Sequence, residues 1–265
     1  MALQPDYRYQ TGAPAGWGRT ATADAAAVDA GLRAYMLRVY NWMASGLLLT
    51  GIVAYAIAVT PELQALFWQV GFNAAGQRVV APTLLGWAAM LSPLAFVLVL
   101  SFGINRLSKT GAQALFWLFA AAMGASLSNI FLRYTGASIA NTFFVTAGMF
   151  AAISLYGYTT KADLTRMGSF MMMGLIGIII AGLVNMFLQS SMLHFVISVI
   201  GVVVFVGLTA YDTQRIKADY LEYAYAEGLE ESGKRSVFDA LGLYLNFVNL
   251  FQLLLQFMGV RQSGE

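Results

Sequence analysis

The sequence has no cysteine, a single histidine and little charge. Without cysteine the chain has no disulfide framework, no thiolate metal site and no thiol nucleophile. Because His194 is the one histidine, a metal site built from several histidines within the chain is excluded. Only 11% of the residues are charged, whereas soluble domains have roughly 25%, so charged side chains cannot cover a water-facing surface. No long basic block is present, which argues against nucleic-acid binding.

Long apolar runs make up most of the sequence. A helix that spans a bilayer needs ~20 mostly apolar residues, and the strands of an outer-membrane barrel would be shorter and alternating. The sequence therefore predicts an all-α membrane protein, a bundle of seven transmembrane helices over residues 35–260. A disordered cytoplasmic tail (1–34) is expected before it and a short tail (261–265) after it. The seven runs are Tyr35–Val59, Pro82–Gly103, Gly111–Phe131, Ser138–Tyr158, Gly168–Leu188, Leu193–Asp212 and Val237–Met258.

Basic residues are distributed unevenly between the two sets of connecting segments. Twelve of the 15 Lys and Arg residues fall in the N-terminal tail and in alternate loops, and the other three are Arg78, Arg133 and Arg261. Lys and Arg are enriched in the cytoplasmic loops of membrane proteins. The asymmetry predicts that the N-terminus is cytoplasmic.

Asp212 is a carboxylate at the end of the apolar run from Leu193 to Ala210. An ionisable group at such a position is costly and is usually functional or an interfacial anchor. Arg215, three residues later, is placed to pair with it on the same helix. The residues alone leave two interpretations open, an interfacial ion pair and a buried gating or proton-linked group.

The last apolar run carries polar residues on one side. At 100° per residue, Asn246, Asn249, Gln252 and Gln256 lie within about a third of the helix circumference, and Asp239 falls at the edge of that face. Such a stripe should face protein or water rather than lipid. It indicates either hydrogen bonding between helices or the lining of a polar path, and we favour the path.

Few features point to catalysis. Ser126 in the third run and His194 in the sixth could form an intramembrane protease dyad, but Gly124-Ala125-Ser126 is also what close helix packing uses. No phosphate-binding Gly-rich loop with its Lys is present. We therefore expect no enzymatic activity and no cofactor.

Two motifs resemble a known family. They are Ala210-Tyr211-Asp212-Thr213-Gln214-Arg215-Ile216-Lys217 and Leu243-Tyr244-Leu245-Asn246-Phe247-Val248-Asn249-Leu250-Phe251. Together they resemble the transmembrane Bax-inhibitor-motif family, in its bacterial branch, and the likeness extends from about Arg33 to Val260. The resemblance implies a seven-helix bundle with the C-terminal helix central, a bacterial inner-membrane location and a pH-sensitive calcium leak.

The resemblance also implies a gate, and this sequence differs from the family's gate at one position. In that family a pair of aspartates, on the sixth and seventh helices, shares a proton and gates the path. Asp212 matches the first aspartate, but the second position is Asn246. An amide has no proton to gain near neutral pH, so the two groups cannot titrate as a coupled pair. Asp239 is the alternative second acid, and Arg106 is the nearest match to a basic residue that pairs with the sixth-helix aspartate.

These observations predict a membrane channel or leak for cations, with calcium as the expected ion and with weaker pH sensitivity than two-aspartate relatives. No fixed metal site is expected, although Asp212 is a candidate calcium contact. The expected partners are the lipid bilayer and calcium ions. The alternative is an interaction protein that modulates a membrane-embedded protease or a stress or cell-death response without transport. The candidate residues are Asp212, Asn246, Asn249 and Asp239 for the gate and path, and Arg106 and Arg215 as salt-bridge partners.

Overall fold

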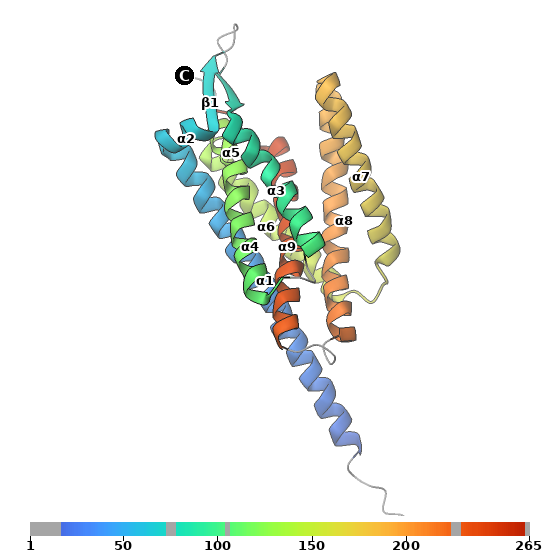
Figure 1. Ribbon diagram of the computed structural model, residues 1–265. Coiled ribbons are helices and arrows are strands. Elements are labelled where there is room, and N and C mark those ends of the chain that lie inside the picture. Colours follow the sequence, from blue (N-terminus) through green and yellow to red (C-terminus); the bar gives the residue numbers. More distant parts are fainter. Residues whose placement is uncertain (1–16, 73–77, 104–106, 224–228, 263–265) are drawn as a thin grey trace, which may run out of the picture.

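The computed structural model describes residues 17–72, 78–103, 107–223 and 229–262, which are helical over most of their length (Figure 1). A two-stranded sheet is inserted between the second and third helices. In chain order the elements are α1 (Trp17–Val59), α2 (Pro61–Phe67), β1 (Trp68–Phe72), β2 (Arg78–Pro82), α3 (Leu84–Gly103), α4 (Lys109–Leu127), α5 (Asn129–Arg133), α6 (Gly136–Thr159), α7 (Thr165–Leu188), α8 (Ser191–Tyr223) and α9 (Leu229–Met258).

The long helices have the length and composition of membrane spans. Within the described ranges, six stretches are long and apolar enough to cross a bilayer, and α3 adds a shorter apolar stretch over Leu84–Val99. Their outward side chains are apolar, as at Phe187 of α7, which is 82% exposed. An exposed apolar surface of this kind is stable against lipid rather than water. The prediction of an all-α membrane protein is confirmed. The six stretches are Val28–Val59, Lys109–Arg133, Gly136–Thr159, Thr165–Leu188, Ser191–Tyr223 and Ser232–Met258.

The structure differs from the sequence-based expectation at the N-terminal segment. Helix α1 begins at Trp17, inside the segment 1–34 that was expected to be a disordered tail. The sequence between Trp17 and Gly31 is rich in alanine, which has the highest helix propensity, and this can extend the apolar helix that follows. Residues 1–16 lie outside the described part of the chain.

A β-hairpin that sequence reasoning did not predict lies at one end of the bundle. Strands β1 and β2 pair antiparallel, with Trp68 opposite Pro82 and Phe72 opposite Arg78. Trp68 is buried, and its indole Nε1 donates a hydrogen bond of 2.7 Å to Ser128 Oγ. Ser128 is also where the third apolar run breaks into α4 and α5. One interaction therefore fixes both the hairpin and this break.

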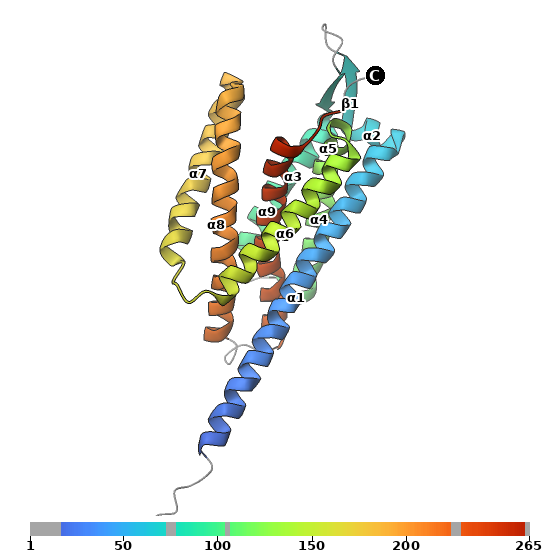
Figure 2. The ribbon, with the colours of Figure 1, turned by 180° about the vertical axis from the view of Figure 1, so that it is seen from behind.

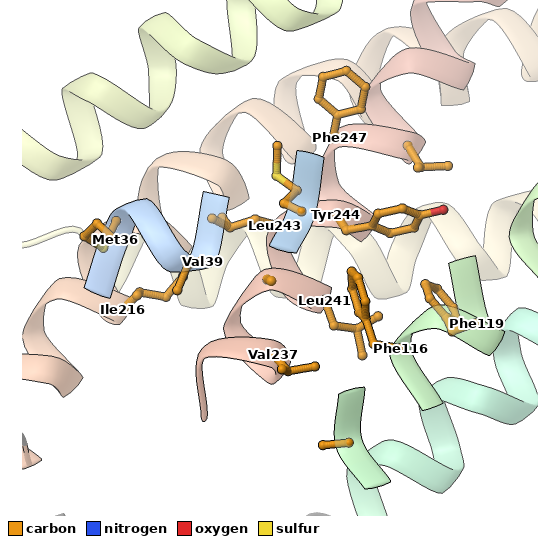
Figure 3. Close-up of a cluster of buried hydrophobic side chains, with 14 of the residues drawn as sticks. Met36, Val39, Phe116, Phe119, Ile216, Val237, Leu241, Leu243, Tyr244 and Phe247 are labelled. Carbon is orange, nitrogen blue, oxygen red and sulfur yellow. The ribbon is translucent and has the colours of Figure 1, made fainter. Parts of the chain in front are cut away.

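Helix α9 packs against α1, α4, α6 and α8 (Figure 2). Its Tyr244 is fully buried, and the ring meets Phe116 and Phe119 of α4 edge-on at centroid distances of 6.2 and 5.3 Å (Figure 3). The Tyr244 hydroxyl lies 2.7 Å from Thr50 Oγ1 of α1. Because a buried tyrosine needs both ring packing and a hydroxyl partner, this residue ties three helices together. Helix α7 packs against α8 (Figure 1).

The chain after α9 is joined to the connection between α5 and α6. Tyr134 and Arg261 form an antiparallel bridge. The Thr135 amide donates to Val260 O at 3.0 Å, and the Gln262 amide donates to Arg133 O at 2.9 Å. These backbone hydrogen bonds hold the C-terminal end of α9 at the end of the bundle that carries the hairpin (Figure 1).

Helices α6 and α8 come into close backbone contact at Gly157. A side chain at this position would collide with the backbone carbonyl of Ala210 in α8. Small residues permit such contacts between spanning helices, where van der Waals packing drives association. Gly148 of the same helix has open space at the corresponding position.

We predict that Gly157→Val lowers the free energy of unfolding by about 1–3 kcal/mol, the usual cost of forcing a side chain into a packed contact. Gly148→Val makes the same change in helix propensity without the collision and should be close to wild type. Thermal unfolding of the two purified variants in detergent checks this. Equal stability of the two would show that the contact with Ala210 does not hold α6 against α8.

Candidate functional site

The candidate site lies on the buried side of α8, around Asp212. Two threonines on this side return their hydroxyl groups to the helix backbone: Thr209 Oγ1 donates to Phe205 O at 2.7 Å, and Thr213 Oγ1 donates to Thr209 O at 2.8 Å. Both threonines are fully buried. In an apolar environment each polar group needs a partner within the protein. The helix itself therefore satisfies the hydroxyl groups on either side of the aspartate.

Both carboxylate oxygens of Asp212 have partners. Asn246 of α9 donates from Nδ2 to Asp212 Oδ2 at 2.7 Å. On the other oxygen, Arg215 Nη1 lies 3.3 Å from Asp212 Oδ1, three residues further along α8. The carboxylate thus joins two helices through one oxygen and an ion pair within its own helix through the other.

Burial changes steeply across these three residues. The side chain of Asp212 is 13% exposed and that of Arg215 is 42% exposed, whereas Asn246 is 6% exposed. The guanidinium therefore lies toward the outside and the amide toward the interior. One oxygen of Asp212 therefore takes part in an ion pair toward the outside and the other in a buried contact between helices. The gating or proton-linked role stays a prediction.

A chain of hydroxyl groups beside Asp212 connects α1, α6 and α8. Tyr40 of α1 is hydrogen-bonded to Ser154 of α6, and Ser154 Oγ lies 2.9 Å from Thr213 Oγ1 of α8. Sequence reasoning did not select Tyr40 or Ser154. The available signal was the spacing of polar residues in the fourth apolar run, four residues apart at Ser138, Thr142 and Thr146 and eight residues further on at Ser154, which places them on one half of a helix.

The structure buries this polar face of α6 within the protein. Ser138, Thr142, Thr146 and Ser154 are all buried, and α6 packs against α8 and α9. The Thr146 hydroxyl donates to Thr142 O at 2.7 Å. Within the described ranges, Thr142 Oγ1 has no hydrogen-bond partner. A buried hydroxyl oxygen without a partner is unusual in a native structure.

The polar stripe on α9 is used in several different ways. Asn246 bonds to Asp212, while Asn249 Nδ2 donates to Leu245 O of its own helix at 2.9 Å. At the far end, Ser198 Oγ of α8 donates to Gln256 Oε1 at 2.5 Å. The stripe therefore contributes contacts between helices at Asn246 and Gln256 and none through the Asn249 amide nitrogen.

Asp239 has a partner on a different helix. Tyr35 of α1 donates its hydroxyl to Asp239 Oδ2 at 2.6 Å, and the Tyr35 ring lies 4.9 Å from that of Tyr220 in α8. In the part of the chain that the structure describes, no hydrogen bond joins Asp239 to Asp212. Asp239 thus belongs to a contact between α1 and α9, two turns from Asn246.

Two other sequence candidates, Ser126 and His194, lie outside this site. Arg106, a candidate partner of Asp212, falls outside the described residues. His194 is exposed in the first turn of α8, and Ser126 is half-buried in α4. No hydrogen bond joins Ser126 to His194 among the contacts of the described side chains. The protease dyad therefore gains no geometric support.

Comparison with known proteins places the chain in a family. The family described as "Inhibitor of apoptosis-promoting Bax1" matches residues 32–263. The chain belongs to this Bax inhibitor family. Among its relatives, an uncharacterized protein of Rickettsia prowazekii is 47% identical over 92% of this chain and 97% of its own length. The inner membrane protein YbhL of Escherichia coli K12 is 47% identical over 88% of this chain and 94% of its own length. The resemblance read from the two motifs is confirmed.

The site of this Bax inhibitor family member contains no built metal centre within the described ranges: no three His, Cys, Asp or Glu side chains gather closely enough to hold an ion. The oxygen atoms near Asp212 instead come from one carboxylate, amides and hydroxyl groups. Hard cations such as Ca²⁺ and Mg²⁺ prefer oxygen ligands, but firm binding takes several carboxylates. The arrangement thus offers a cation several neutral oxygen ligands and a single carboxylate.

In this family member the residues after Asp212 hold the connection between α6 and α7. Gln214 Oε1 accepts from the Leu164 amide at 2.8 Å, and Gln214 Nε2 donates to Ala162 O at 2.8 Å. In the same connection Asp163 Oδ1 accepts from the Thr165 amide at 2.9 Å. Hydrogen bonds from the side chain and backbone of Thr165 hold the pKa of Asp163 below its ordinary value. The motif around Asp212 thus positions a loop as well as a carboxylate.

We predict that Gln214→Leu speeds hydrogen exchange of the Leu164 amide about fivefold, because one hydrogen bond contributes ~1 kcal/mol net. The Thr165 amide, which bonds to Asp163, serves as an internal control and should keep its rate. Hydrogen-exchange mass spectrometry or NMR on the purified protein measures both. An unchanged Leu164 rate would show that Gln214 does not hold this connection.

Proposed function

We propose that this protein is a membrane path for cations, with calcium as the transported ion, closed by the contact between Asp212 and Asn246. The observation that carries the proposal is the 2.7 Å hydrogen bond from Asn246 Nδ2 to Asp212 Oδ2, between α9 and α8. Ionisable residues inside a spanning helix commonly mark ion pathways. The resemblance of the two motifs to a family of calcium leaks supports the choice of ion.

A line of oxygen-bearing side chains supports a path on both sides of this contact. The members are buried or half-buried polar residues of the three helices α6, α8 and α9, which pack against one another. Hydroxyl and amide oxygens can replace part of the hydration shell of a hard cation. The line comprises Ser138, Thr142, Thr146 and Ser154 on α6, Ser198, Thr209 and Thr213 on α8, and Asn246, Asn249 and Gln252 on α9.

We further propose that α3 is a seventh span and that α9 is the central helix. Twenty residues of α3 extend ~30 Å at 1.5 Å per residue, enough for the hydrocarbon core. The central position is supported by burial, because the α9 span Ser232–Met258 is more buried than the other five candidate spans. We propose a cytoplasmic N-terminus and an inner-membrane location. These are supported by the positive-inside rule and by the similarity to an inner membrane protein.

The proposed gate contains one acid and one amide, and this limits its response to pH. Two facing carboxylates share a proton at low pH and repel each other once both are ionised. Asn246 cannot release or gain a proton near neutral pH, so its hydrogen bond to Asp212 does not turn into a repulsion. The proposal therefore includes weak pH dependence of transport.

We predict that Asp212→Asn lowers calcium flux into reconstituted vesicles by about tenfold, which corresponds to ~1.4 kcal/mol in the barrier. The substitution keeps the size and one acceptor oxygen for Asn246 but removes the charge that attracts the cation. Asp219→Asn, seven residues further along α8, is the matched control and should leave the flux unchanged. Equal flux in the wild type and Asp212→Asn would contradict the assignment of Asp212 to the gate. Absence of calcium flux in the wild type would favour the interaction-protein alternative.

We predict that Asn246→Asp creates a steep pH dependence. At low pH the new carboxyl group shares a proton with Asp212 and the contact stays closed. As the pH rises and both groups ionise, repulsion opens the contact and the flux increases. Wild-type flux should change less than about twofold across the same range, because a neutral amide cannot supply the repulsion.

The matched control is Asn249→Asp, which adds a carboxylate less than one turn further along α9, where the native amide bonds to its own helix. Flux in vesicles, measured against pH for the three proteins, separates the outcomes. Equally steep curves for the two aspartate variants would mean that added charge, rather than its position opposite Asp212, controls transport.

A further inference from the structure

A long groove lies between α1 and α6, and neither Asp212 nor Asn246 lines it. Its volume is about 1080 Å³. Along α1 it is lined from Arg33 to Tyr55, and along α6 from Phe143 to Tyr158. The stretch of α1 is ~33 Å long at 1.5 Å per residue, close to the ~30 Å thickness of the hydrocarbon core. Phe247 of α9 also lines the groove.

The groove is apolar and opens to the outside of the bundle. Its lining residues Leu48, Ile52 and Leu155 are each more than half exposed. In the middle of its wall, the hydroxyls of Tyr40 and Ser154 are bonded to each other. These two groups are therefore satisfied within the protein next to an apolar occupant. In a bilayer, lipid acyl chains can reach this surface from the outside of the bundle.

Positive charge lies at one end of this groove. Arg33 lines that end, is exposed and has no ion-pair partner among the described residues. Lys217 of α8 donates from Nζ to Tyr158 O at 2.9 Å and lies 5.0 Å from the Tyr158 ring centroid. Tyr158 itself lines the groove. Two cations next to the end of an apolar channel are complementary to a phosphate attached to a hydrocarbon chain.

We propose that the groove binds an anionic glycerophospholipid from the leaflet on the Arg33 side. An acyl chain lies along α1 and α6, and the headgroup phosphate contacts Arg33 and Lys217. This proposal is independent of ion transport. A lipid fits the observations better than a partner helix. The groove combines an apolar length comparable to the bilayer core with positive charge at its end, and no carboxylate is paired with Arg33 or Lys217 among the described residues.

The test is native mass spectrometry of the delipidated protein in detergent, titrated with phosphatidylglycerol and with phosphatidylcholine of the same acyl chains. Arg33→Gln should weaken binding of phosphatidylglycerol about fivefold, the effect of one basic residue near an anionic lipid, and should leave phosphatidylcholine nearly unchanged. Arg38→Gln is the matched control, since Arg38 is exposed on the same helix and does not line the groove. Equal binding by the two variants would overturn the headgroup contact.

A second pair of variants tests the acyl-chain position. Ala151 lines the groove, whereas its neighbour Ala152 does not, and both are exposed. Ala151→Phe should fill the groove and lower binding of both lipids about tenfold, while Ala152→Phe should bind as the wild type does. Equal lipid binding by the two phenylalanine variants would place the lipid elsewhere. Dimers that form in place of lipid adducts, and that Ala151→Phe abolishes, would assign the groove to a second copy of the chain and overturn the proposal.

Discussion

The buried part of the molecule depends on how the negative charge of Asp212 is compensated inside an apolar bundle. A carboxylate in a spanning helix is costly unless its oxygens meet donors or cations. Asp212 meets Asn246 on one side and Arg215 on the other. The first contact requires α9 to lie directly against α8, and the second requires this turn of α8 to reach the outside. Together they fix the depth of α8 and its rotation toward α9.

Close helix packing makes this compensation possible. Gly157 lets α6 reach the backbone of α8 at Ala210, two residues before Asp212. The same approach brings Ser154 next to Thr213. On the opposite side of α9, Tyr244 is held by the rings of α4 and by the Thr50 hydroxyl of α1. The polar contacts of α9 therefore lie opposite a tightly packed aromatic contact, which limits how far α9 can shift away from α8.

Sequence reasoning predicted the parts of the fold that follow from hydrophobicity. Each apolar run overlaps a helix, because a long run without turn residues has few alternatives in a bilayer. The proximity of Asp212 and Asn246 was also predicted, but through the two motifs rather than through spacing. The hairpin was missed because its strands have only five residues each and follow a helix directly. The helix from Trp17 was missed because its composition resembles that of a polar tail.

The partners of individual polar residues could not be predicted, because they depend on the rotation of each helix. Asp239 and Asn246 share a helix face, yet one bonds to Tyr35 of α1 and the other to Asp212 of α8. Along α9, two turns shift a side chain far enough to face another helix. Tyr40 and Ser154 were missed for the same reason: a hydroxyl in an apolar run carries no sign of its partner until both helices are placed.

The bridge between Tyr134 and Arg261 gives α9 one fixed end. The backbone hydrogen bonds around it oppose sliding of the helix along its axis. Separation of Asn246 from Asp212 would then be a tilt about the end near Met258. Asn246 lies 12 residues before Met258, a lever arm of ~18 Å, so a tilt of roughly 10° would displace it by about 3 Å. That displacement is as large as the hydrogen bond itself, so a small rotation of one helix is enough to break the contact.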